Sequence, residues 1–167
     1  MRITLCIALC LGAGWLGSLV TRPALMTWYG GLSKPNWTPP NWLFAPVWTV
    51  IYVLMGIAVG LTWRRSSLAA VPMQLFLLQL LLNVAWSAVF FRFRSPGSAF
   101  VEIVALWCAT LVTALSFRNS DRLAGWLMIP YLVWVSYAAA LNFAIWRLNP
   151  ERDAENDDFD FSSRDSH

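Results

Sequence analysis

Histidine, lysine and acidic residues are scarce in this sequence of 167 residues. The only histidine is His167, at the C-terminal end, and the only lysine is Lys34. The apolar segments therefore hold no lysine that could carry a chromophore as a Schiff base, and no histidine that could ligate a haem or metal ion. The three cysteines, Cys6, Cys10 and Cys108, form no CxxC pair and are interpreted as small apolar residues.

Charged residues are also few, at 13% of the chain, whereas hydrophobic residues make up 58%. A soluble domain of this size cannot bury so much apolar surface, so the excess must face lipid. The positive charges lie singly or in pairs between the apolar segments, which is not the pattern of a nucleic-acid-binding surface. The sequence therefore predicts an integral multi-pass membrane protein with no nucleic-acid partner.

Five apolar segments are long enough to cross a bilayer, and each is flanked by Arg, Pro, Gly or Asn. They occupy residues 3–21, 44–63, 73–91, 99–117 and 123–146. Their polarity does not alternate at every second residue, as the strands of a membrane barrel would require. We therefore expect an all-α integral membrane protein, a bundle of five transmembrane helices, in one domain of residues 1–149.

Both ends of the chain carry signals of their own. Residues 3–21 follow Arg2 as in a signal peptide, but no convincing cleavage site follows, so we expect this segment to stay as a helix. Residues 150–167 hold seven acidic groups and almost no aliphatic side chains, which predicts a disordered acidic tail. The basic residues near the span ends are balanced, five against five, so the positive-inside rule gives no orientation.

Glu102 is the one acidic residue inside an apolar segment, about a turn into residues 99–117. A carboxylate within the membrane is costly unless it is paired or protonated, which makes Glu102 a candidate functional group. We favour the simpler interpretation that it lies near the membrane interface, where it acts as a cap or pairs with Arg92, Arg94 or a neighbouring helix.

Polar and aromatic residues form one stripe on each of three expected helices, at the spacing of a single helical face. The stripes are Trp48, Tyr52 and Met55; Gln79, Asn83, Trp86 or Ser87, and Phe90; and Tyr131, Trp134, Ala138 and Asn142. Lipid does not solvate amides, so these faces should point into the bundle. For Gln79 and Asn142 we favour hydrogen bonds between helices. The wall of a pocket is assigned to Trp48, Tyr52, Asn83, Trp86 and Trp134.

Tryptophan, in contrast, is abundant, with 11 residues in the chain. Several crowd residues 28–52, WYGGLSKPNWTPPNWLFAPVWTVIY, where prolines fix the backbone between aromatic side chains. Such a segment is typical of a preorganised pocket for a large flat apolar ligand. Pro39 and Pro40 should hold Trp37 and Trp42 over the helix ends as a lid. Interfacial anchoring is the interpretation of Trp63, Trp126 and Trp146, which lie near span ends.

The ordered set of motifs resembles one membrane-protein family. WYGGLSKPNWTPP is followed by FAPVWTVIY, then by LLNVAWSAVFF in the third span and PYLVWVSYAAALNFAIWRLN in the fifth. Over about residues 3–149 these segments are similar to the tryptophan-rich sensory proteins, the bacterial TspO/MBR relatives of the mitochondrial translocator protein (peripheral benzodiazepine receptor). The resemblance implies a homodimeric five-helix bundle that binds porphyrins in a pocket closed by the first loop. For some members it also implies binding of sterols and of isoquinoline or benzodiazepine drugs.

The resemblance also implies which residues bind the ligand. Carried over by motif, and joined by Ala138 from the third stripe, they are Tyr29, Trp37, Trp48, Tyr52, Asn83, Trp86 and Trp134.

One motif departs from the family. Mitochondrial members carry a cholesterol-recognition pattern of Leu or Val, Tyr, and Arg or Lys near the end of the fifth span. Residues 141–147 here contain no tyrosine, and Tyr137 is too far from Arg147 to serve. We therefore expect weak or no cholesterol recognition and a location in a bacterial cell membrane, with an outer membrane as the alternative.

Three functions remain open from the sequence. The first is sensing, regulation or transport of tetrapyrroles by binding, with protoporphyrin IX or a related compound as ligand, lipids as further partners and no cofactor required. The second is light-dependent porphyrin degradation, for which Trp48 and Trp134 would be the catalytic residues. The third is a structural membrane scaffold. We rank binding first, because the sequence has no nucleophile and base pair of a conventional catalyst.

Overall fold

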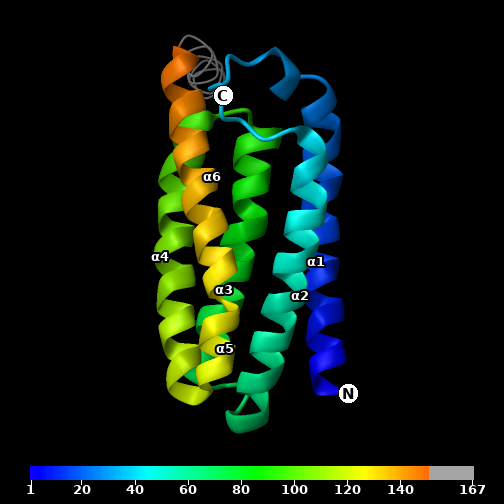
Figure 1. Ribbon diagram of the computed structural model, residues 1–167, viewed down its shortest axis with the longest axis vertical. Helices are drawn as coiled ribbons and strands as arrows, with labels where there is room; N and C mark the ends of the chain where they lie inside the picture. The colour runs from blue at the N-terminus through cyan, green and yellow to red at the C-terminus, as the bar shows by residue number, and fades with distance from the viewer. Residues whose placement is uncertain (151–167) are drawn as a thin grey trace, which may run out of the picture.

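The computed structural model describes residues 1–150, and the predicted acidic tail lies outside the described residues, apart from Pro150. The described chain folds into helices: α1 (Arg2–Met26), the 3₁₀ turn η1 (Tyr29–Gly31), α2 (Asn41–Arg65), α3 (Val71–Ser87), the π-helical turn η2 (Ala88–Arg92), α4 (Pro96–Ser120), α5 (Arg122–Leu127) and α6 (Ile129–Leu148). Figure 1 shows the long helices running along one common axis, with the first loop and the end of α6 at the same end of the bundle.

Five helical stretches of the described chain are long and apolar enough to cross a membrane. They are Arg2–Leu19, Asn41–Arg65, Val71–Arg92, Pro96–Ser120 and Arg122–Leu148. Large apolar side chains on their outer surfaces are exposed, for example Leu81 and Val101 at 69% and 71%, as expected of helices that face lipid. The prediction of an all-α membrane protein with five spans is confirmed.

The predicted stripes face the interior of the bundle. Met55, Gln79, Tyr131 and Asn142 are at most 1% exposed, and Asn83 is 2% exposed. The amide and hydroxyl groups of these stripe residues are therefore kept away from lipid, which cannot hydrogen-bond to them.

Two predicted boundaries differ from the structure. The helix that contains the first span, α1, extends beyond the predicted segment 3–21, through Pro23 to Met26, and the loop before α2 is correspondingly shorter. The fifth span is not one helix, because α5 ends and α6 begins around Met128. Pro130 has no N–H, so it cannot donate a hydrogen bond to the preceding turn. Just before it, the N–H of Met128 donates to the carbonyl of Gly125 at 3.2 Å, three residues earlier.

Two glycines of α2 bring it into backbone contact with α1. A Cβ atom on Gly56 would lie 2.5 Å from Cα of Ile7, and one on Gly60 would lie 2.9 Å from Cα of Ile3. Small residues at helix interfaces allow this close approach, which is a main source of packing energy in membranes. The tight contact lies in the half of α1 and α2 that is remote from the first loop, as Figure 1 shows.

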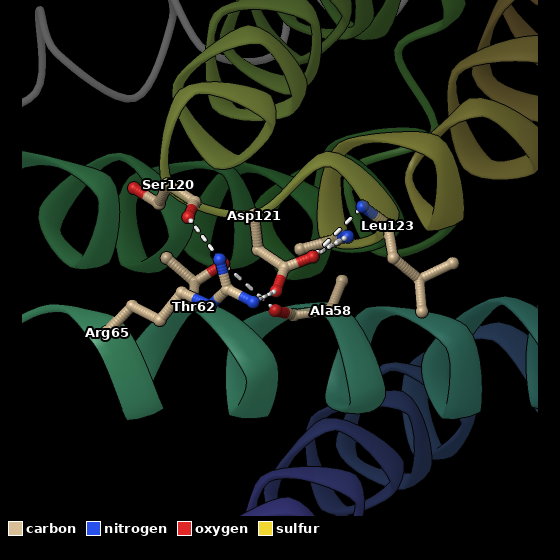
Figure 2. A network of polar contacts seen from close by, with 7 residues as sticks. Ala58, Thr62, Arg65, Ser120, Asp121 and Leu123 are labelled. Atoms are coloured by element: carbon tan, nitrogen blue, oxygen red, sulfur yellow. Dashed lines mark hydrogen bonds and ion pairs between the residues drawn. The ribbon is translucent and has the colours of Figure 1, made fainter.

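Asp121 ties the same end of the bundle together, as Figure 2 shows. Its Oδ1 atom accepts hydrogen bonds from the backbone N–H groups of Leu123 at 2.9 Å and Ala124 at 3.2 Å, which caps α5. Its Oδ2 atom pairs with Nη2 of Arg65 on α2 at 3.0 Å. One carboxylate thus starts a helix and joins that helix to α2.

We expect Asp121→Ala to lower the free energy of unfolding by about 1–2 kcal/mol, because it removes the cap of α5 from a buried position. Arg65→Ala should cost less than about 1 kcal/mol, since the Arg65 side chain is 64% exposed and exposed ion pairs contribute little. Denaturant unfolding in detergent, followed by circular dichroism, measures both. Equal losses would mean that the ion pair, and not the cap, is the stabilising interaction.

Candidate ligand-binding site

A cavity of about 340 Å³ lies in the half of the bundle nearest the first loop. Its walls come from α1, α2, the end of α3 with η2, and α6. Five residues of the predicted stripes line it, Trp48, Tyr52, Trp86, Trp134 and Ala138, and so does Ser87, the alternative to Trp86. The structure therefore brings together residues from three separate spans, as the stripes indicated.

Flat aromatic rings form one wall of the cavity. Trp48 stacks on Tyr52 with ring centroids 5.6 Å apart and planes at 29°. Trp134 meets Trp48 almost at a right angle, with centroids 6.4 Å apart and planes at 89°. Phe44 lies edge-on to Trp134 at 5.9 Å. Trp48, Tyr52 and Trp134 together form an aromatic corner, in which two nearly perpendicular apolar surfaces are available to a ligand.

A buried hydrogen-bond chain holds Tyr52 in this wall. The Tyr52 hydroxyl donates to Oδ1 of Asn83 at 2.5 Å, and Nδ2 of Asn83 donates to the Tyr131 hydroxyl at 3.0 Å. Asn83 does not itself line the cavity. Gly14 of α1 leaves room for the Tyr52 ring, because a Cβ atom there would overlap the ring. Asn83 therefore supports the wall from behind.

Asn142 joins three helices behind the cavity. It accepts a hydrogen bond from Nε1 of Trp86 at 3.2 Å and donates through Nδ2 to the carbonyl of Pro96 at 2.7 Å. The predicted role of Asn142 in linking helices is confirmed. Gln79, predicted to act in the same way, is fully buried, and its amide makes no hydrogen bond with the described residues.

The indole N–H group of Trp134 is not hydrogen-bonded within residues 1–150. Its Nε1 atom is buried. A buried donor without a partner costs free energy.

The wall opposite the tryptophans belongs to α1, and the sequence reasoning missed it. It runs from Leu11 to Leu25 and includes small or polar residues about one helical turn apart, Gly14, Gly17, Ser18 and Thr21, together with Arg22. Trp15 also lines the cavity and is 62% exposed, so the cavity reaches the outer surface of the bundle. The spacing of these small residues was visible in the sequence, but small residues in a membrane helix equally favour helix packing.

Tyr29 lies beside the cavity and not in its wall. It is 3% exposed and lines a smaller space of about 30 Å³, which shares Phe44, Trp86 and Ala138 with the larger cavity. Burial, and secondarily the neighbouring Tyr137, raises the pKa of the Tyr29 hydroxyl to about 12. Tyr29 is therefore a neutral phenol at physiological pH.

Trp37 lies in the first loop at the surface, 48% exposed, and is absent from the cavity wall. Its indole lies edge-on to the Tyr137 ring at 5.6 Å, and its carbonyl accepts a hydrogen bond from the Tyr137 hydroxyl at 2.8 Å. The contact fixes the first loop to α6. Ligand contact by Trp37 stays a prediction.

The end of α6 provides a second attachment for the loop. Nδ2 of Asn149 donates to the carbonyl of Ser33 at 2.9 Å, and the N–H of Ser33 donates to Oδ1 of Asn149 at 3.0 Å. Lys34 steadies the same segment, since its Nζ atom donates to the carbonyl of Tyr29 at 2.7 Å. The loop is therefore held in place over one end of the bundle by specific hydrogen bonds.

Comparison with known proteins assigns the chain to one family. The model of the TspO/MBR family matches residues 6–147. The chain belongs to the TspO/MBR family. The tryptophan-rich protein TspO of Chlorobaculum tepidum is 44% identical over 154 residues, covering 90% of this chain and 97% of that protein.

Two other relatives of this TspO/MBR protein span bacteria and animals. The translocator protein of Homo sapiens is 36% identical over 139 residues, covering 81% of this chain and 82% of its own. The tryptophan-rich sensory protein of Cereibacter sphaeroides is 34% identical over 139 residues, covering 81% of this chain and 87% of that protein. The family resemblance read from the motifs is confirmed.

Glu102 has no described partner in this TspO/MBR protein. Both carboxylate oxygens are buried and make no hydrogen bond with the described residues, and Glu102 does not line the cavity. The expected hydrogen-bonded pairing with Arg92, Arg94 or a neighbouring helix is therefore not found within residues 1–150.

We expect replacement of both Pro39 and Pro40 by glycine to speed ligand release. Pro40 precedes the first residue of α2 in an extended conformation, and glycine at both positions would free the backbone there. Stopped-flow measurement of the protoporphyrin IX off-rate tests this, with Pro72→Gly at the opposite end of the bundle as the control. Helical content by circular dichroism should stay nearly constant. An unaltered off-rate in the double variant would show that the loop is only a connector.

Proposed function

We propose that this TspO/MBR protein binds a tetrapyrrole, protoporphyrin IX or a close relative, in the aromatic cavity, and that binding serves sensing, regulation or transport. The observation that carries the proposal is the corner formed by Trp48, Tyr52 and Trp134. Flat rings of this kind stack on a flat apolar ligand, and the small residues of α1 leave space opposite them.

The size of the cavity supports this class of ligand. A volume of about 340 Å³ lies at the lower end of the range for small-molecule sites, about 300–1,000 Å³. The lining residues Trp15 and Thr49 are exposed on the outer surface, so a macrocycle that exceeds the enclosed space can extend between α1 and α2. A free-base porphyrin should bind at least as well as haem, because the described chain contains no histidine to ligate iron.

Light-dependent degradation is the second candidate, because both indoles of the corner, Trp48 and Trp134, face the cavity and would contact a photosensitising ring. The resemblance further supports a homodimer in a bacterial cell membrane, competition by isoquinoline or benzodiazepine drugs, and weak cholesterol binding. These properties are part of the proposal.

Titration of the purified protein with protoporphyrin IX, in the dark and under illumination, tests the proposal. We expect saturable quenching of tryptophan fluorescence in the dark with no change in the number of porphyrin absorbance bands. N-acetyltryptophanamide under the same conditions controls for absorption of the emitted light. Quenching that fails to saturate, or that does not exceed the quenching of the control, would overturn binding. A new product that forms only in light and only with protein would establish the enzymatic candidate.

A further inference from the structure

The cavity carries one cationic group, and it lies at the mouth. Arg22 is exposed on α1, one turn beyond Ser18 and within one turn of Leu25, the last residue of α1 that lines the cavity. We propose that Arg22 selects ligands that carry a carboxylate on the rim of a flat apolar body. This inference rests on the proposed function and specifies the chemical class of ligand that the same site takes.

The other basic residues at this end of the bundle are placed differently. Lys34 already donates to the carbonyls of Tyr29 and Gly30, and its Nζ atom lies 4.7 Å from the centroid of the Tyr29 ring. Arg92, Arg94 and Arg147 do not line the cavity. Arg22 is therefore the one cation among the described residues that a ligand in the cavity can reach.

No described carboxylate neutralises Arg22. Residues 1–150 contain two acidic groups, Glu102 and Asp121, and neither lines the cavity. Asp121 pairs with Arg65 at the opposite end of the bundle, as Figures 1 and 2 show together. A guanidinium with no counter-ion among residues 1–150, at the edge of an apolar cavity, is complementary to an anionic ligand.

Carboxylate is the anion that this geometry favours. A guanidinium presents parallel N–H donors that match the two oxygens of a carboxylate. Since Arg22 lies at the end of α1 that faces the loop, the charged pair stays partly hydrated while the flat body packs against Trp48 and Trp134 deeper in the bundle. Arg22 thus orients the ligand, with its carboxylates towards the loop. A lipid phosphate is the competing anion at this depth.

Comparison of protoporphyrin IX with its uncharged dimethyl ester tests the inference. Dissociation constants are measured for both compounds, in dodecyl maltoside without added phospholipid, on the wild type, Arg22→Gln, Arg22→Lys and Arg147→Gln. Arg147 is exposed at the same end of the bundle, so its variant controls for the loss of one charge. We expect Arg22→Gln to weaken the diacid about fivefold and the ester less than about twofold. Arg22→Lys should recover part of the loss, and Arg147→Gln should change neither constant.

The outcomes separate the inference from the proposed function. If neither compound binds the wild type, the proposed function itself fails. If both compounds bind the wild type, and Arg22→Gln weakens the diacid and the ester equally or weakens neither, the cavity binds porphyrin but Arg22 does not recognise the carboxylate. If Arg22→Gln leaves the affinity for the diacid unchanged in detergent but abolishes retention of a phospholipid that copurifies with the wild type, Arg22 holds a lipid phosphate and the inference is overturned.

Discussion

Replacing Trp134 by alanine is expected to weaken protoporphyrin IX binding by about 1–3 kcal/mol, because a large stacking surface disappears from the cavity wall. Trp134 contacts Trp48 and Phe44 within the aromatic corner, and its unpartnered Nε1 donor is lost with it. Fluorescence titration in the dark measures the loss of affinity.

The matched control for this variant is Trp146→Ala. Trp146 is on the same helix but stacks on Phe100 and lies edge-on to Phe143, and it does not line the cavity. Its removal should barely change affinity. If the two variants bind protoporphyrin IX alike, the assignment of the α6 stripe to the ligand site is wrong.

The second large effect is expected on stability, from Gly56→Ala. The added Cβ atom would lie 2.5 Å from Cα and 2.7 Å from N of Ile7, and neither backbone atom can move without shifting α1. Overpacking of this kind costs about 1–3 kcal/mol. We expect a lower midpoint when the protein is unfolded by increasing sodium dodecyl sulfate in mixed micelles, followed by circular dichroism.

Gly12→Ala on α1 is the control, because no atom lies within 4 Å of the Cβ position there. Alanine is favoured over glycine inside a helix by about 1 kcal/mol, so this variant should be unchanged or slightly more stable. If Gly56→Ala unfolds at the same midpoint as Gly12→Ala, the close contact between α1 and α2 does not stabilise the bundle.

The spans were predictable from the sequence because the membrane imposes a length and an apolar composition that few other structures need. Their ends were less predictable. The first apolar segment was expected over residues 3–21, yet α1 continues through Pro23 to Met26. Prolines are tolerated in membrane helices where neighbouring groups satisfy the backbone, and that compensation is a tertiary property.

The inward direction of the amides was also predictable, since Asn83 and Asn142 have no partner in lipid. Their separate roles were not. Asn83 bonds to Tyr52 and Tyr131 behind the wall, whereas Trp86, on the same stripe, reaches the cavity. One turn along a helix decides between a supporting and a lining position, and spacing alone does not resolve it.

The contribution of α1 was the largest omission. A search for aromatic side chains finds surfaces on which a ligand stacks, but the cavity also depends on side chains that are small, such as Gly17 and Ser18. Space is a property of the packed helices. The space depends on how α1 packs relative to α6, which the local sequence does not determine.

The most direct test of the central claim is to fill the cavity from within. Ala138 lines it, whereas Ala140, two residues later on α6, is exposed on the outside. The dissociation constant of protoporphyrin IX is therefore compared for Ala138→Phe and Ala140→Phe, with circular dichroism to confirm that both fold. The account predicts at least about tenfold weaker binding for Ala138→Phe, since the phenyl ring takes the place of the ligand, and unchanged binding for Ala140→Phe. Wild-type affinity in a folded Ala138→Phe variant would show that porphyrin does not bind in this cavity.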